Sequence, residues 1–279
     1  MDAAFGEPRN FFTNRYIYLV ISQRARGLSL GVNLNPDQVC NFNCVYCEIK
    51  RSAGDRDRRV NAKVMSAELR KVLNLVENGQ IQGMPCYNSV PEDLLQLREI
   101  HLSGDGEPTL CPNFSEVVET VVHLRAMGNL PYYKLVLITN GTGLQEPEVQ
   151  TGLAHFAATD EIWIKLDAGS QARMELINRS YVPLARILEN ILALGKRRPI
   201  IIQSLFPIFH DQEPTPQDIE DYVQRLVELK QGGAQIAQVQ IYSAHRPANS
   251  PDCGHLSLKT LSRIAHRVKD AAGLATEVF

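Results

Sequence analysis

The chain has 279 residues, a formal net charge of -2 and a composition that is 44% hydrophobic and 22% charged. These values are typical of a soluble globular protein with a sizeable core, and they argue against a general nucleic-acid-binding surface. The beginning of the chain lacks a basic region followed by an apolar core, and no run of about 18 apolar residues occurs. We therefore expect a cytoplasmic protein with no membrane segment.

Strand and helix patterns alternate along the chain. Residues 1–28 are expected to form an extension, in which 16–22 is a strand packed outside the main sheet, ahead of one domain over 29–279. β-branched and aromatic runs predict further strands, and apolar residues at helical spacing predict helices between them. The strands are predicted at 28–34, 98–102, 134–139, 161–166, 199–205 and 238–242, and the helices at 66–78, 114–125, 147–156, 184–192, 215–227 and 257–268.

Several helix ends carry local signals. Ser66 is a predicted N-cap, and Gly79 lies beyond the end of the same helix. Thr215 before Pro216 predicts another helix start, and Ser257 predicts the last one. Residues 80–97 are expected to be irregular.

The alternation predicts an α/β fold with mostly parallel strands and helices outside the sheet. Six strand–helix units are too few to close an eight-stranded barrel. We therefore predict a partial (β/α)6 barrel of the TIM type. Residues 50–63 are dense in charge, and two interpretations stay open: a solvated loop, or a basic patch that binds substrate.

Three cysteines lie within eight residues as C-x3-C-x2-C: Cys40, Cys44 and Cys47. Structural zinc needs four ligands, and the nearest histidine in sequence is His101. Ferredoxin-type runs supply a fourth cysteine, which is also missing nearby. Three close thiolates favour a [4Fe–4S] cluster with one iron open to a small molecule, while zinc remains the alternative. The shell of such a cluster is expected to be apolar, as Phe42, Val45 and Tyr46 are.

The cysteine spacing, with Tyr46 directly before the third cysteine, resembles the signature of the radical SAM superfamily. The resemblance implies that Cys40, Cys44 and Cys47 hold a [4Fe–4S] cluster and that S-adenosylmethionine (SAM) chelates the open iron. It implies an oxidoreductase-type enzyme that cleaves SAM reductively to a 5′-deoxyadenosyl radical, which abstracts hydrogen from a substrate. Tyr46 would contact the adenine.

A second stretch, Ser103-Gly-Asp-Gly-Glu-Pro-Thr109, resembles the Gly-Gly-Glu element of the same family. The resemblance implies that Gly104, Asp105, Gly106 and Glu107 bind the amino group of SAM. Glycines let backbone approach a ligand closely, and a carboxylate suits an ammonium group. Which of Asp105 and Glu107 takes that role stays open, as does the alternative of an ordinary strand-to-helix turn.

Two later strand ends also resemble family elements. Thr139 and Asn140 match the third-strand element, although a simple β-turn is the alternative. Lys165 and Asp167 match the fourth-strand element, with Lys165 where many members have serine. A lysine suits the SAM carboxylate, and Asp167 would orient either Lys165 or a ribose hydroxyl. Surface charge is the alternative for Lys165.

The ends of the last strands resemble a wyosine-type subgroup of radical SAM proteins. The resemblance adds Gln203 and Tyr242 to the cofactor-binding residues. It also suggests two candidate catalytic residues, His245 as a proton shuttle and Arg246 as a contact for a substrate phosphate or carboxylate, with ordinary loop roles as the alternative. It raises a modified tRNA base as a possible substrate. Residues 1–39 contain no cysteines for the second cluster of wyosine enzymes, so a small-molecule or peptide substrate is equally compatible.

The remaining cysteines, Cys86, Cys111 and Cys253, match no cluster spacing and are expected to be buried or loop thiols. The resemblance implies one partner, a flavodoxin-like or ferredoxin-like electron donor. The rival from another class is a non-catalytic iron–sulfur or zinc-binding protein.

Overall fold

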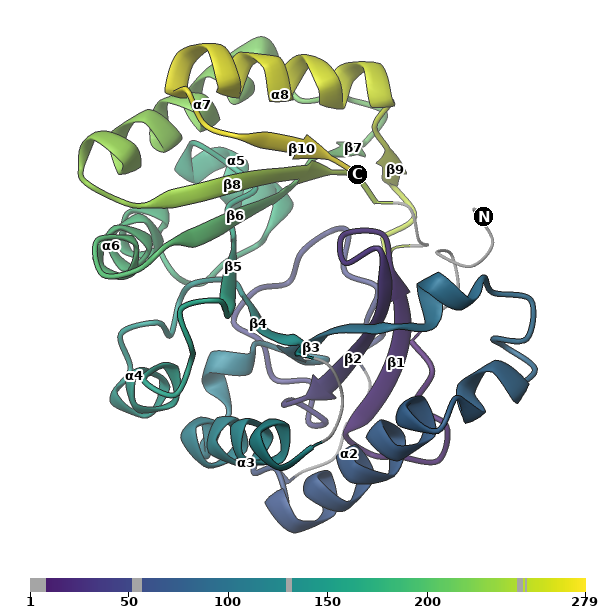
Figure 1. Cartoon of the computed structure of the whole chain (residues 1–279). Coiled ribbons are helices and arrows are strands. Elements are labelled where there is room, and N and C mark those ends of the chain that lie inside the picture. The colour runs from purple at the N-terminus through teal and green to yellow at the C-terminus, as the bar shows by residue number, and fades with distance from the viewer. Residues whose placement is uncertain (1–8, 52–56, 129–131, 245–247, 249) are drawn as a thin grey trace. The chain divides into compact units, whose positions relative to one another are not determined.

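The computed structural model describes residues 9–51, 57–128, 132–244, 248 and 250–279 (Figure 1). The chain forms two compact units that are interleaved along the sequence. The first unit contains Met1–Val39, Gly54–Leu137 and Glu146–Glu161, and the second contains Cys40–Ala53, Ile138–Gln145 and Ile162–Phe279. No linker separates the units, and a boundary after residue 28 stays a prediction.

The sheet of the first unit contains four strands in the order β1, β2, β3, β4. β2 is parallel to β3 and β3 to β4, whereas β1 is antiparallel to β2. The expectation that 16–22 packs outside the main sheet is therefore wrong. A short turn returns the chain so that Ile17 pairs with Val32, and the ring of Tyr18 packs against Gly31. The strands are β1 (Ile17–Ser22), β2 (Gly27–Asn33), β3 (Leu97–Ser103) and β4 (Lys134–Thr139).

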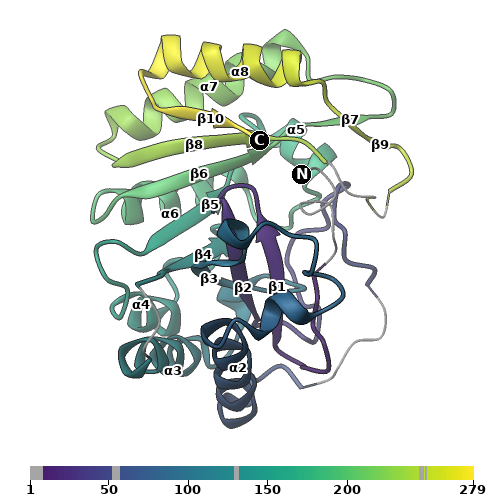
Figure 2. The same ribbon diagram turned by 45° about the vertical axis from the view of Figure 1, so that its right-hand side comes forward.

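Helices cover this sheet on one side. α2 (Ala62–Glu77) packs against β1 and α3 (Phe114–Met127), and α3 packs against α4 (Pro147–Leu153) (Figure 2). α2 begins four residues before the predicted Ser66, because Asn61 caps it by accepting the Val64 amide at 3.2 Å. Three 3-10 turns complete the unit: η1 (Gln80–Gly83), η2 (Glu92–Leu95) and η3 (Pro108–Leu110).

The second unit contains a parallel sheet in the order β5, β6, β8, β10. A pair of three-residue antiparallel strands, β7 and β9, lies outside it. β7, β9 and β10 are too short to give a strand pattern in the sequence. The strands are β5 (Glu161–Lys165), β6 (Ile200–Leu205), β7 (Pro207–Phe209), β8 (Ile236–Tyr242), β9 (Cys253–His255) and β10 (Thr276–Val278).

The helices of the second unit are α5 (Gln171–Ile177), α6 (Leu184–Gly195), α7 (Pro216–Gln231) and α8 (Leu258–Ala272). α7 and α8 lie against each other, and α8 packs on β8 and β10 (Figure 1). Thr215 forms a full capping box with Asp218, and the Ser257 hydroxyl accepts the Thr260 amide at 3.2 Å, so both predicted helix starts are confirmed.

The expected alternation of parallel strands and helices is thus present in both units. In the described ranges, no helix combines the length and the apolar character that crossing a membrane would require. Each loop that carries a sequence motif follows the carboxyl end of a parallel strand, where α/β folds place their ligands.

Candidate functional site

The cysteine loop (residues 40–47) belongs to the second unit and runs beside the turn that follows α5. The amide of Val45 donates to the carbonyl of Ile177 at 2.9 Å, and the amide of Asn43 donates to that of Asn178 at 2.9 Å. In the opposite direction, the amide of Tyr181 donates to the carbonyl of Asn41 at 3.4 Å. Residues 178–182, called here the α5 turn, therefore hold the loop along its length.

Two of the three thiols accept N–H groups. The Sγ of Cys40 accepts the amide of Phe42 at 3.4 Å, and the Sγ of Cys44 accepts the side-chain amide of Asn178 at 3.5 Å. Burial, and after it the negative charge of Asp167, raises the pKa of Cys44 to about 11. The thiol of Cys44 is consequently protonated at neutral pH, and binding a metal there would release a proton.

Three neighbouring thiols are suitable ligands for an iron–sulfur cluster, and zinc remains the alternative. Zinc needs four donors around one ion. In a cubane each thiolate binds its own iron, so the sulfurs need not converge, and N–H groups directed at the sulfurs tune the cluster.

The shell around the loop is apolar, as expected. Phe42, Val45 and Tyr46 are all buried. Val45 and Tyr46 pack with Ile177, Leu205 and Phe209. Further residues lie at the margin of this cluster: Cys44, Tyr242, Ala244 and Cys253.

The other cysteines behave as ordinary thiols. Cys86 is exposed and Cys111 is buried, while Cys253 is half-buried on β9. Burial raises the pKa of Cys111 and that of Cys253.

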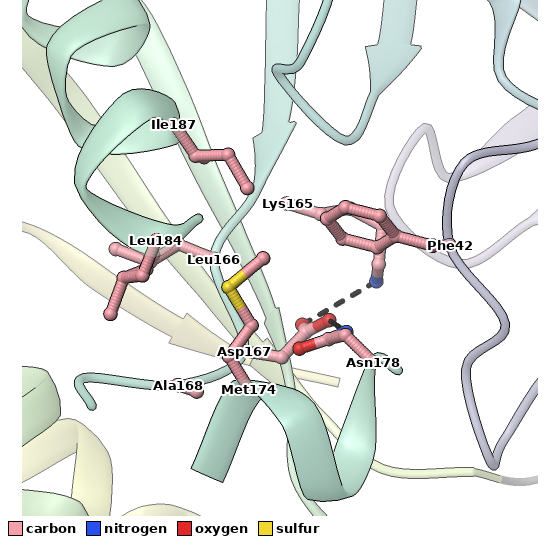
Figure 3. A pocket seen from close by; sticks show the side chains of 9 residues that line it. All are labelled: Phe42, Lys165, Leu166, Asp167, Ala168, Met174, Asn178, Leu184 and Ile187. Atoms are coloured by element: carbon pink, nitrogen blue, oxygen red, sulfur yellow. Dashed lines mark hydrogen bonds and ion pairs between the residues drawn. The ribbon is translucent and has the colours of Figure 1, made fainter. Parts of the chain in front are cut away.

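Asp167, just beyond the end of β5, connects the cysteine loop to the sheet. Its carboxylate accepts the hydroxyl of Tyr46 and the backbone amide of Leu205 at 2.8 Å. It also accepts the side-chain amide of Asn178 at 2.7 Å (Figure 3). Burial, with the charge of Asp167, raises the pKa of Tyr46 well above its ordinary value, so its hydroxyl stays a donor.

Lys165 lies on the same side of the site. Its Nζ is 3.5 Å from Asp167 and donates to the hydroxyl of Tyr242 at 3.0 Å. The ammonium also lies over two rings, 5.0 Å from the centroid of Tyr46 and 5.3 Å from that of Tyr242. Burial alone would lower the pKa of Lys165, but Asp167 and Tyr242 together raise it above its ordinary value. Lys165 is therefore held as a cation.

A small cavity of about 10 Å3 lies beside this ion pair. Figure 3 shows Lys165 and Phe42 on one side of it, with Asp167 and Asn178 below. It is about as large as one water molecule requires. The remaining lining is mainly apolar: Leu166, Ala168, Met174, Leu184 and Ile187.

Gln203 and Tyr242 join the same network. The hydroxyl of Tyr242 donates to Gln203 Oε1 at 3.3 Å, and Gln203 Nε2 donates to Gln240 Oε1 at 3.2 Å. Lys165 pairs with Gln203 and Gln203 with Gln240 in the sheet register, so polar side chains form a row across β5, β6 and β8.

Asn140 and Thr142, which follow β4, brace the cysteine loop. The side-chain amide of Asn140 donates to Asn41 Oδ1 at 2.7 Å, and Asn41 Nδ2 donates to Thr142 Oγ1 at 2.7 Å. Thr139 Oγ1 accepts the amide of Gly141 at 3.0 Å. These contacts orient the loop from within the chain.

The glycine loop (residues 103–107) belongs to the first unit, and its glycines have a reason that differs from the expected one. A Cβ on Gly106 would lie 1.9 Å from the carbonyl oxygen of Val39, and one on Gly104 would lie 2.2 Å from Asn35 Oδ1. The amide of Glu107 donates to that same Val39 carbonyl at 2.9 Å. Gly106 is needed because the backbone of Val39 approaches it closely, and Gly104 because the side chain of Asn35 does.

The two carboxylates of the glycine loop both have partners inside the protein. Glu107 is buried and accepts the amide and the hydroxyl of Thr109 at 3.1 and 2.7 Å. Asp105 pairs with Arg9 at 2.7 Å and accepts Asn33 Nδ2 at 2.8 Å. Asp105 is the more accessible of the two.

Sequence reasoning missed Asn178 and the pair Glu99–His101. Asn178 gave no signal, since two of its three side-chain contacts, with Cys44 and Tyr46, are with residues more than 130 positions away. Glu99 and His101 alternate on β3, so both project from the face that carries Ser29; Glu99 Oε1 lies 2.6 Å from His101 Nε2 and accepts Ser29 at 3.0 Å. That alternation was a usable signal. The predicted catalytic residues His245 and Arg246 lie outside the described residues.

No family model matches the chain. A UPF0026 protein of Helicobacter pylori strain J99 is 30% identical over 179 residues, covering 63% of this chain and 50% of that protein. A UPF0026 protein of Synechocystis is 32% identical over 182 residues, covering 63% of this chain and 56% of that protein. The chain thus spans about half the length of the curated relatives it matches.

Among solved structures, a radical SAM methyltransferase from Sphaerobacter thermophilus superposes with a TM-score of 0.63. The superposition covers 94% of this chain and 68% of the methyltransferase chain, at 15% sequence identity. The chain has the fold of the radical SAM enzymes. A structure of TYW1 with a lysine-pyruvate adduct bound shares this radical SAM fold, with a TM-score of 0.57 at 14% identity over 92% of this chain and 84% of that one. The predicted α/β fold of the partial-barrel type is confirmed.

Proposed function

We propose that the chain is a radical SAM enzyme in which Cys40, Cys44 and Cys47 hold a [4Fe–4S] cluster. When bound, the cluster supplies the electron that cleaves SAM to methionine and a 5′-deoxyadenosyl radical. The protein then has to bind SAM, orient it and keep water away from the radical.

One observation carries the proposal. The aromatic before the third cysteine, Tyr46, donates its hydroxyl to Asp167, and Asn178 bonds both of them as well as Cys44. The cysteine motif and the Lys-Leu-Asp motif are 121 residues apart at this contact. Their side chains meet in one buried network, as a shared binding site would require.

The roles of the chain's residues follow from this network. We propose that the Lys165 ammonium, kept charged by Asp167, pairs with the carboxylate of SAM. The ring of Tyr46 and the apolar residues around it exclude water. Of the two acids in the glycine loop, Asp105 is the one proposed to bind an ammonium group, because Glu107 is buried against Thr109.

A tRNA base-modifying reaction is the second reading of the substrate, raised by the resemblance of the last strand ends to the wyosine-type subgroup. The chain also shares its fold with the structure of TYW1 with a lysine-pyruvate adduct bound. The adduct named for that structure calls for a lysine that acts as a nucleophile, which requires the neutral amine. Lys165 is instead held as a cation by Asp167. We therefore propose that Lys165 binds an anionic group and forms no adduct, so borohydride with pyruvate should trap nothing on this residue.

The test of the main proposal uses protein reconstituted with iron and sulfide without oxygen. We expect a brown protein that releases 5′-deoxyadenosine from SAM when a reductant is added. Cys40→Ala, Cys44→Ala and Cys47→Ala should each lose iron and SAM cleavage, whereas Cys86→Ala, at an exposed thiol, should keep both. Full cleavage by any one of the three loop variants would sink the assignment, and a colourless, inert protein would favour zinc.

The substrate class can be read from the same assay. Fractionated cell extract is added as RNA, peptide and small-molecule pools, and 5′-deoxyadenosine release is compared between them. Stimulation by the RNA pool alone would support the tRNA reading, and stimulation by another pool would replace it.

A further inference from the structure

We propose that the outer surface of the cysteine loop docks an acidic electron-transfer protein. This docking face comprises residues 40–51 and residues 176–182, which are the end of α5 together with the α5 turn. The inference rests on the proposed function, because a cluster that reduces SAM must itself receive electrons from outside the chain.

The docking face is continuous with the thiols. Its two segments are joined by the backbone bonds Asn43 to Asn178, Val45 to Ile177 and Tyr181 to Asn41. The side chain of Asn178 also reaches the Sγ of Cys44. A partner bound to the α5 turn would therefore touch the segment that carries the cluster ligands.

The charge of this face differs from that of the whole chain. Lys50, Arg51 and Arg179 are exposed and cationic, and Glu48 is the one acid within the two segments. The chain as a whole has a net charge of -2. The nearest acid on α5, Glu175, accepts a bond from Gln171 at 2.9 Å. A local positive field of this kind steers an acidic partner toward the loop.

The face also carries apolar surface that a partner would cover. Tyr181 is 85% exposed, and Leu176, on the last turn of α5, is 45% exposed. Tyrosine and arginine are enriched at protein interfaces and supply most of their binding energy. Partners in electron transfer use small interfaces, so one aromatic anchor with three cations is of the right size.

The cations are held in place before binding. Arg51 donates to the carbonyl of Phe42 inside the cysteine loop. Arg179 has a left-handed backbone with φ 47° and lies over the ring of Phe209 at 6.0 Å. Preorganised side chains lose less entropy on binding, which favours a stable docking surface. RNA could also contact arginine and tyrosine, but the position of these residues around the thiols favours a partner that delivers electrons there.

The experiment compares two reductants on the reconstituted holoprotein. The variant is Lys50→Glu with Arg179→Glu; Arg51 is left intact because it bonds the cysteine loop. With dithionite, the release of 5′-deoxyadenosine should stay within about twofold of wild type. With an acidic flavodoxin, kept reduced by its NADPH-dependent reductase, kcat/KM for flavodoxin should fall about tenfold or more, the range expected for lost electrostatic steering.

A matched control reverses two exposed cations on α8, Lys259→Glu with Arg263→Glu. It makes the same change in net charge and should leave both assays within about twofold of wild type. Raising the ionic strength should slow the flavodoxin reaction of wild type and of the control, and should have little effect on the docking-face variant.

Each other outcome overturns a distinct claim. If the wild type fails to cleave SAM even with dithionite, the proposed function fails. If wild type cleaves SAM but the docking-face variant responds to flavodoxin as wild type does, the docking face is wrong. Loss of the dithionite reaction in that variant would show a structural role, and tRNA binding lost in that variant alone would assign the face to RNA instead.

Discussion

The cysteine loop and the glycine loop both follow a parallel strand, yet their polar side chains are used differently. In the glycine loop, Glu107 caps a turn and Asp105 pairs with Arg9, while the side chain of Asn35 and the backbone of Val39 pack closely against the two glycines. In the cysteine loop, Tyr46, Asp167 and Asn178 form a network beside the thiol of Cys44. Glycines in a turn can thus reflect close packing within the chain. Several buried polar side chains that meet at one place are the better sign of a binding site.

The largest expected effect comes from removing the centre of the cysteine-loop network. Asp167→Ala leaves Lys165 without its counter-ion and the amide of Leu205 without its acceptor. The free energy of unfolding of the metal-free protein should fall by about 4 kcal/mol, as for other buried ion pairs that lose one partner. Urea unfolding measures this.

Glu189→Ala is the control for that measurement, since Glu189 is 66% exposed in a pair with Arg186. It should cost less than about 0.5 kcal/mol. An Asp167 variant that is as stable as this control would show that the network around Asp167 is not a structural centre.

The second effect tests the packing role of the glycine loop. Gly106→Ala places a Cβ 1.9 Å from the carbonyl oxygen of Val39, so backbone must move. We expect a loss of about 2 to 3 kcal/mol in the free energy of unfolding, in the range for overpacked sites. Gly83→Ala, where nothing lies within 4 Å of the new Cβ, should be neutral or slightly stabilising. Equal stability of the two variants would contradict the close approach.

The third effect is a pH dependence of stability that differs between Glu99 in the first unit and Lys165 in the second. Burial alone raises the pKa of Glu99, but His101, Lys134 and Ser29 hold it below its ordinary value. Its contribution to stability is therefore present above about pH 4.3 and is lost as the pH falls below that value. The pKa of Lys165 is raised, so its contribution is present below about pH 10.4 and is lost as the pH rises.

Two single variants isolate these contributions. In urea unfolding across pH, Glu99→Gln should reduce the loss of stability at acid pH without changing the loss at alkaline pH, and Lys165→Met should do the reverse. One group changes the slope by at most about 1.4 kcal/mol per pH unit, and Asp160, whose pKa is also lowered, adds to the acid loss. If either variant reduced both losses equally, the roles given to Glu99 and Lys165 would be wrong.

The smallest effect concerns Arg9, which pairs with Asp105 and lies over the rings of Phe11 and Tyr18. Arg9→Ala should cost about 1 kcal/mol in unfolding free energy, because both members of the pair are partly exposed to water. Arg9→Lys should recover part of the loss, since lysine keeps the charge but not the flat stacking surface. A loss as large as that expected for Asp167→Ala would show that the contacts of the glycine loop contribute as much to stability as those of the cysteine loop.

Local signals in the sequence were sufficient for much of the fold. The caps at Thr215 and Ser257 depend only on the next few residues, and both are confirmed. The start of α2 was misplaced because Asn61 and Ser66 are both good caps, and only the observed bond to Val64 decides between them. β1 was placed outside the sheet because its pairing with β2 is not encoded in its own residues.

The residues of the candidate site also divide into those that the local sequence predicts and those that depend on distant contacts. Lys165 and Asp167 are two residues apart on one strand, and their contact was expected from the motif. Asn178 could not be found, since an asparagine after a helix is an ordinary cap until its distant neighbours are known. The glycines were correctly singled out for close approach, but which atoms approach them is a tertiary fact.

Asn178 has one further consequence, which comes from counting hydrogens. Its side-chain nitrogen carries two hydrogens but lies within reach of three acceptors, at 2.7 Å from Asp167, 3.0 Å from Tyr46 and 3.5 Å from Cys44. The amide can donate fully to only two of these acceptors at one time, so the third acceptor competes with them for a hydrogen. More negative charge on the Cys44 sulfur would draw a hydrogen away from the Tyr46 hydroxyl or from Asp167. A change in charge on Cys44 would therefore change the hydrogen bonding of Tyr46 through the side-chain amide of Asn178.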